Sequence, residues 1–143
     1  MEPLMPTTLQ KLRANAFRRQ SGCCYYCKQP MWIDDINRFA AANELTLRQA
    51  RGRQCTAEHL VARQDGGTDT SENIVAACWI CNQRRHQRSR PGSPEDYRTH
   101  VQRRVAQGRW HQARSERIVQ GDRRPVPASP RRWLGGDEGD GSS

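Results

Sequence analysis

The sequence predicts a small α+β fold. Two short strands and a helix form a module that is held together by a metal ion or disulfides, and further helices lie before and after it in the chain. Residues 53–61 and 73–77 are short and partly alternating, as strands are, and residues 81–90 suit a helix. Two Cys-x-x-Cys pairs bracket these strands, CYYC at 24–27 and CWIC at 78–81. Only 34% of the 143 residues are hydrophobic, so the core is small and a staple is expected.

Two helical segments are predicted before the first strand. Residues 7–20 have apolar side chains at helical spacing and a threonine, Thr7 or Thr8, to cap them, so residues 1–21 are assigned to an N-terminal helix. A second helix opens at Asp34-Asp35, inside the segment between the cysteine pairs, and residues 47–50 add a short turn. This insert could form a helix-turn-helix, but packing against the stapled module is the favoured interpretation.

A basic helical extension is predicted over residues 93–120. Ser93 is a typical N-cap, Pro94 suits the first helical position, and two acids follow in the first turn. Tyr97, Val101 and Val105 form an apolar stripe, and a second short helix is expected over 109–120. Residues 121–143 are rich in Pro, Gly and Ser and are expected to be disordered.

The charge of the chain indicates a polyanionic partner. The net charge is +9, and residues 82–133 contain 14 arginines against 4 acidic residues. Such a basic segment favours nucleic acid, although an arginine-rich coding bias with a solvated surface is the simpler alternative. No run of 18 apolar residues and no apolar leader core is present, so we expect no membrane partner and a cytoplasmic location.

The cysteine spacing predicts a structural zinc site. In a reducing cytosol, paired cysteines bind metal more often than they form disulfides. Two Cys-x-x-Cys turns complete a tetrahedral Zn²⁺ site, so the expected ligands are Cys24, Cys27, Cys78 and Cys81. Cys23 could replace Cys24 through a three-residue spacing. Cys55 is expected to be a small buried apolar residue.

Between the two cysteine pairs lie, in order, Glu58-His59, Gly66-Gly67 and Asn73, and Asn82 directly follows the second pair. In this order, and with the two cysteine pairs, they resemble the HNH endonuclease family (ββα-metal or His-Me finger fold), in the branch with two Cys-x-x-Cys zinc knuckles. The resemblance covers about residues 22–90. We therefore assign residues 22–92 to a zinc-bracketed HNH nuclease module with an inserted helix.

The resemblance implies a role for each of these residues. His59 would be the general base, and Glu58 and Asn82 would bind a catalytic Mg²⁺ or Mn²⁺. His86 lies four residues after Asn82 and could be a further ligand, which would favour Ni²⁺ or Zn²⁺, or it could contact phosphate or be simply exposed. Asn73 would bond the backbone of the loop and hold His59 at its angle.

The predicted function is that of a metal-dependent HNH endonuclease that nicks DNA or cuts both of its strands. The expected phosphate contacts are Arg84, Arg85, Arg88, Arg90, Arg103 and Arg104. Double-stranded DNA is the expected substrate; a monomer would nick it and a homodimer could cut both strands. The alternatives are a non-catalytic zinc-stapled nucleic-acid-binding module and an RNA-binding zinc protein, although 6% aromatic residues offer few stacking platforms.

Overall fold

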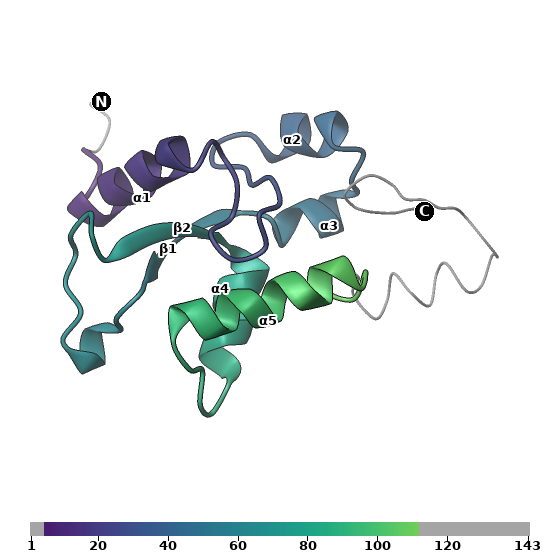
Figure 1. The fold of residues 1–143 in the computed structure, drawn as a ribbon. Coiled ribbons are helices and arrows are strands. Elements are labelled where there is room, and N and C mark those ends of the chain that lie inside the picture. Colours follow the sequence, from purple (N-terminus) through teal and green to yellow (C-terminus); the bar gives the residue numbers. More distant parts are fainter. Residues whose placement is uncertain (1–4, 112–143) are drawn as a thin grey trace.

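The computed structural model describes residues 5–111 and confirms the α+β class (Figure 1). A two-stranded antiparallel sheet lies at the centre, with helices before and after it in the chain. The elements are α1 (Thr8–Arg19), α2 (Ile36–Ala42), α3 (Leu47–Arg51), β1 (Cys55–His59), the 3-10 helix η1 (Arg63–Asp65), β2 (Ile74–Cys78), α4 (Trp79–Gln87) and α5 (Pro94–Ala106).

The register of the sheet determines which residues lie opposite each other at the two ends of the strands. Cys55 of β1 lies opposite Cys78 of β2, and His59 lies opposite Ile74. Every residue of β2 is buried, because α1 packs on the strands and α4 begins directly where β2 ends (Figure 1). The backbone of Ala76 also bonds the side chain of Gln20 in both directions, at 2.8 and 2.9 Å. This amide therefore satisfies backbone groups of β2 that β1 does not reach.

The three helical pieces predicted before the sheet are all present. Thr7 caps α1 in a capping box with Gln10, and the helix is a residue shorter at each end than the predicted 7–20. Asp35 caps α2, which ends at Ala42. The short turn expected at 47–50 is a helix, α3, with its own capping box at Thr46.

The helices after the sheet also follow local signals. The one predicted at 81–90 instead spans Trp79–Gln87, so the second cysteine pair lies at its start. Ser93 caps α5 as predicted, accepting a bond from the Asp96 backbone at 3.0 Å. Of the helix expected over 109–120, residues 109–111 are not helical; residues 112–120 and the tail expected over 121–143 lie outside the described residues.

The core is small and rich in cysteine. Cys55 is 1% exposed, as predicted for a small buried residue. Tyr26 and Tyr97 meet edge to face with ring centroids 4.8 Å apart, and Trp110 closes the same cluster. Large aliphatic side chains are few among the fully buried residues. A core of this composition depends on whatever holds its sulfur atoms together.

The loop between the strands needs glycine at one position because of a close backbone approach. A Cβ atom on Gly67 would lie 1.7 Å from the carbonyl oxygen of Val61. Gly66, by contrast, has open space around it and a φ of +94°. The predicted Gly-Gly turn therefore draws the far arm of the loop tightly against the end of β1. Within the described part of the chain, no helix is long and apolar enough to cross a membrane.

Candidate functional site

Four buried cysteines form a cluster that can hold a metal ion such as zinc. Cys24 and Cys27 come from the turn after α1, and the other two are Cys78 and Cys81 at the start of α4. Their sulfur atoms all lie within 4.8 Å of one another. The Cys27 and Cys78 sulfurs are 3.9 Å apart, close to the ~3.8 Å edge of a tetrahedron with Zn–S bonds of about 2.3 Å. Cys23 is outside the cluster, so the two-residue spacing applies.

Groups around the cluster stabilise its sulfur atoms. The backbone N–H groups of Tyr26 and Cys78 each donate to the Cys24 sulfur at 3.3 Å. Trp110 donates its indole N–H to the Cys81 sulfur at 3.2 Å, and His111 Nε2 lies 3.2 Å from the Cys27 sulfur. Neither of the last two contacts was predicted, because Trp110 was expected in a helix over 109–120 and His111 had no predicted role.

Two thiols of this cluster resist ionisation, and one is ionised readily. Desolvation, together with hydrogen bonds from neighbouring cysteines, raises the pKa of Cys27 and of Cys81 well above the usual value. Against the effect of burial, hydrogen bonds from the other three cysteines lower the pKa of Cys24 well below the usual value. Metal binding requires thiolates, so binding releases these protons. Metal affinity is therefore expected to fall as the pH falls.

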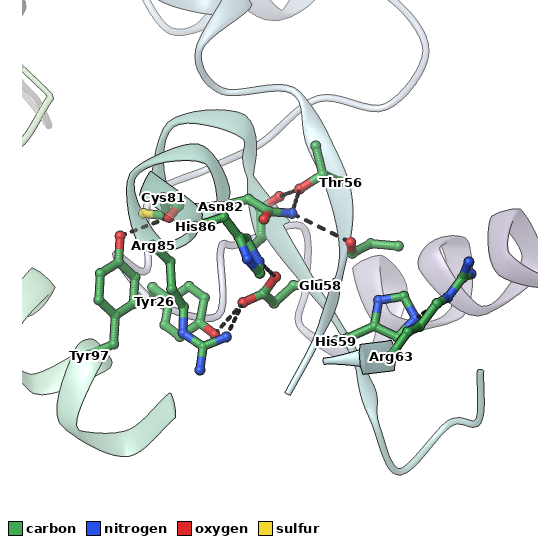
Figure 2. A network of polar contacts seen from close by, with 12 residues as sticks. Tyr26, Thr56, Glu58, His59, Arg63, Cys81, Asn82, Arg85, His86 and Tyr97 are labelled. Atoms are coloured by element: carbon green, nitrogen blue, oxygen red, sulfur yellow. Dashed lines mark hydrogen bonds and ion pairs between the residues drawn. The ribbon is translucent and has the colours of Figure 1, made fainter. Parts of the chain in front are cut away.

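The carboxylate of Glu58 is the most deeply buried charge near the sheet. Its side chain is 1% exposed, and Figure 2 shows three side chains directed at it. Tyr26 Oη and Arg85 Nη1 each donate to Oε2 at 2.8 Å. His86 Nε2 lies 3.0 Å from Oε1. Burial and the adjacent carboxylate raise the pKa of Tyr26, so its phenol stays neutral and donates to Glu58.

Asn82 and His86 share one face of α4 because they are four residues apart. That face is directed at β1, where Asn82 contacts Thr56 and His86 contacts Glu58 (Figure 2). Thr56 donates its hydroxyl to the Ala77 carbonyl at 2.7 Å and accepts a bond from Asn82 Nδ2 at 2.9 Å. The orientation of the Asn82 amide is thereby set. With its nitrogen directed at Thr56, the amide has its oxygen as the atom that could bind a cation.

His59 ends β1 one residue after Glu58, and its side chain is 16% exposed. Its Nε2 atom lies 2.8 Å from Asp69 Oδ1, and Arg63 Nη2 donates to Asp69 Oδ2 at 2.9 Å. Asp69 was not predicted as a site residue. Its only signal in the sequence is its place shortly after Gly66-Gly67, because its contact with His59 depends on how the loop folds.

Asn73 ties together the two arms of the loop between the strands. Its Oδ1 atom accepts from the Val61 backbone at 2.8 Å, and its Nδ2 atom donates to the carbonyls of Val61 and Thr68 at 3.0 and 2.9 Å. These bonds are to backbone groups on both sides of the loop.

The predicted phosphate-binding arginines fall into two groups. Arg85 is 6% exposed and ion-paired with Glu58, so the expectation that it meets phosphate is wrong for this structure: a buried acid on β1 draws it inward. Arg84 is half-buried, with its guanidinium 4.6 Å from the centre of the Trp110 ring. The others lie on or near the surface: Arg88, Arg90 and Arg103 are exposed and Arg104 is half-buried.

Replacement of Cys24 is expected to remove the metal, whereas replacement of its neighbour is not. Purified wild-type protein should contain about one zinc ion per chain. Cys24→Ser removes one of four sulfur ligands and should lose that zinc, with loss of folded structure. Cys23→Ser is the matched control and should keep it. Elemental analysis and circular dichroism measure both; equal zinc content in the two variants would contradict the ligand assignment.

Removal of the Arg85 guanidinium should destabilise the zinc-loaded protein strongly. Arg85→Ala leaves the buried Glu58 charge without its cation, which typically costs about 3–5 kcal/mol of the free energy of unfolding. Arg90→Ala, at an exposed position, should change it by less than about 0.5 kcal/mol. Urea unfolding of both variants checks this. Similar midpoints would show that the Arg85–Glu58 pair contributes little.

A comparison with known families agrees with this arrangement. Residues 42–88 match the family model described as HNH endonuclease. No curated protein and no solved structure gave a match. The matched segment runs from the end of α2 through β1 and β2 to α4 and includes Glu58, His59, Asn73 and Asn82. This segment is therefore similar to the HNH endonuclease family, and the four-cysteine cluster that brackets its strands is consistent with the form that has a zinc-binding knuckle.

Proposed function

We propose that the protein is a metal-dependent HNH endonuclease that hydrolyses phosphodiester bonds in DNA. The observation that supports this best is the contact between two possible metal ligands, Glu58 and His86, with a third, Asn82, on the same helix. Glu58 from β1 and His86 from α4 are in contact, and Asn82 lies on the same side of α4 (Figure 2). A carboxylate, an amide oxygen and an imidazole are suitable ligands for a divalent cation.

The spacing of these groups fits a catalytic cation. Glu58 Oε1 and His86 Nε2 are 3.0 Å apart, which is the separation of adjacent ligands around a cation at about 2.1 Å. The oxygens of Glu58 and Asn82 favour Mg²⁺ or Mn²⁺, and the His86 imidazole extends the range to Ni²⁺ or Zn²⁺. When bound, such a cation supplies positive charge at the scissile phosphate and at the leaving oxygen.

In this proposal His59 is the general base. A neutral imidazole accepts a proton from water at physiological pH. The water oxygen forms a bond to phosphorus as the ester P–O bond breaks, and the released oxygen takes a proton from solvent. Asn73 supports this step by holding the loop that closes over the end of β1. Arg85 keeps the Glu58 charge compensated rather than touching DNA.

The substrate we propose is double-stranded DNA. The exposed Arg88, Arg90 and Arg103 follow α4 or lie on α5, and arginines of this kind bind phosphates without regard to sequence. Reduced cysteines in a metal cluster suit a reducing compartment, so we propose that the protein acts in the cytoplasm. A monomer would nick one strand, and a homodimer could cut both.

One observation favours the alternative of a non-catalytic nucleic-acid-binding module. Glu58 is almost fully buried, and both of its oxygens already contact donors. A cation would have to replace the His86 contact with Oε1 or bridge the two groups. The two candidates differ in their dependence on His59, because binding alone has no use for a general base.

His59→Ala is therefore expected to slow the nicking of supercoiled DNA by about 10²–10⁴-fold in Mg²⁺ or Mn²⁺, the usual contribution of general-base catalysis. His100→Ala, on α5 and outside the site, is the control and should cleave at the wild-type rate. Gel electrophoresis separates nicked from linear product. A binding module would show no metal-dependent cleavage in any variant; wild-type cleavage by His59→Ala would reject the base assignment.

Arg103 and Arg104 are expected to add sequence-independent affinity for DNA. Replacing both with alanine should weaken binding and reduce the slope of log K against log salt by about one to two units, since each phosphate contact contributes about 0.9. Arg18 and Arg51, exposed on α1 and α3, form the control pair and should leave the slope unchanged. Fluorescence anisotropy at several salt concentrations measures both. Equal slopes in the two double variants would place α5 away from the DNA.

A further inference from the structure

We propose that Asp69 is a positioning residue for His59: its carboxylate accepts the Nε2–H of the imidazole and leaves Nδ1 as the basic nitrogen. This inference rests on the proposed function for its catalytic meaning, but the contact itself can be tested without any cleavage. It assigns a role to a loop residue that lies outside the group formed by Glu58, Asn82 and His86.

The geometry is that of a charge-assisted hydrogen bond. Asp69 Oδ1 and His59 Nε2 are 2.8 Å apart, within the usual range for an imidazole donor and a carboxylate acceptor. The two side chains are 33% and 16% exposed, so water competes for this bond only in part. A histidine whose second nitrogen is bonded to a carboxylate has both its ring orientation and its tautomer determined.

The proton on this bond belongs to His59. The hydrogen bond with His59, with the neighbouring Arg63, holds the pKa of the Asp69 carboxyl below its usual value. An ionised carboxylate can only accept, so Nε2 must donate and Nδ1 keeps its lone pair. Arg63 Nε also directs its N–H at the same Nε2 atom, at 3.3 Å, and accepting that bond would require the imidazole proton on Nδ1 instead. The contact with the ionised Asp69 carboxylate is shorter, at 2.8 Å, so it decides the tautomer. Arg63 Nη2 donates to the other Asp69 oxygen at 2.9 Å. Arg63 therefore helps to fix the orientation of the Asp69 carboxylate.

Contacts within the loop hold Asp69 in this position. Gly67 allows the loop to approach the Val61 carbonyl more closely than any side chain would permit. Asn73 Nδ2 donates to the carbonyl of Thr68, the residue before Asp69, at 2.9 Å. Asn73 therefore acts on His59 through the backbone that carries Asp69. This gives a physical route for the orienting role that the resemblance implied for Asn73.

Asp69→Asn is the sharpest test because it keeps the shape of the side chain. The new amide can donate from its nitrogen to Nε2, which favours the opposite tautomer, with the proton on Nδ1. We expect kcat for DNA cleavage to fall by about 10–100-fold, the usual effect of removing a group that orients a functional histidine, with KM unchanged. Asp69→Glu should recover part of the loss. Asp65→Asn, in the same loop, is the control and should match the wild type.

Long-range ¹H–¹⁵N spectra of the zinc-loaded protein report the tautomer directly at about pH 8, where imidazole is neutral. We expect the Nε2–H form for His59 in the wild type and in Asp65→Asn, and a shift toward the Nδ1–H form in Asp69→Asn. An Nδ1–H form in the wild type, or an unchanged tautomer and kcat in Asp69→Asn, would overturn the inference. An Nε2–H form in a wild-type protein that cuts no DNA would uphold the contact and reject the nuclease proposal.

Discussion

The convergence of four cysteine sulfurs at one point is the constraint on which the rest of the structure depends. Two of them lie in the turn after α1 and two where β2 passes into α4, so a single metal ion would join the N-terminal turn, the sheet and the helix. Apart from three aromatic residues and Met31, the buried residues around them are small. Hydrophobic burial alone is marginal in such a core, whereas bonds from thiolates to a metal add folding free energy directly.

The same cluster also determines where the functional groups stand. Tyr26 lies between two of the cysteines and reaches Glu58. Asn82 directly follows the last cysteine, and Arg85 and His86 lie one turn further along α4. Loss of the metal would therefore disturb the environment of the Glu58 carboxylate, even with Tyr26, Arg85 and His86 all unchanged. The buried Arg85 balances this carboxylate, and such a pair costs much less to bury than a lone charge. His59 is held separately, from the loop side, through Asp69.

Features that depend on neighbours in the sequence could be predicted, and features that depend on distant partners could not. The N-cap at Ser93 and the Cys-x-x-Cys turns are local, so their patterns sufficed. The inward turn of Arg85 depends on a buried acid 27 residues earlier, and a run of arginines is ordinarily solvated. The contact of Asp69 with His59 depends on how the loop folds back. The family resemblance supplied roles for Glu58, His59 and Asn82, but the composition of the chain indicated only a polyanionic partner.

In the proposed function, the Glu58 carboxylate, at the meeting point of β1 and α4, is a ligand of a catalytic cation as well as a partner of Arg85. A crystal structure of the zinc-loaded protein soaked in Mn²⁺, with anomalous scattering to locate manganese, would show whether it is. We expect a manganese peak bonded to Glu58 and Asn82, with His86 beside it and Arg85 still on the remaining carboxylate oxygen. Manganese bound elsewhere, with Glu58 still held by Tyr26, Arg85 and His86 alone, would contradict it.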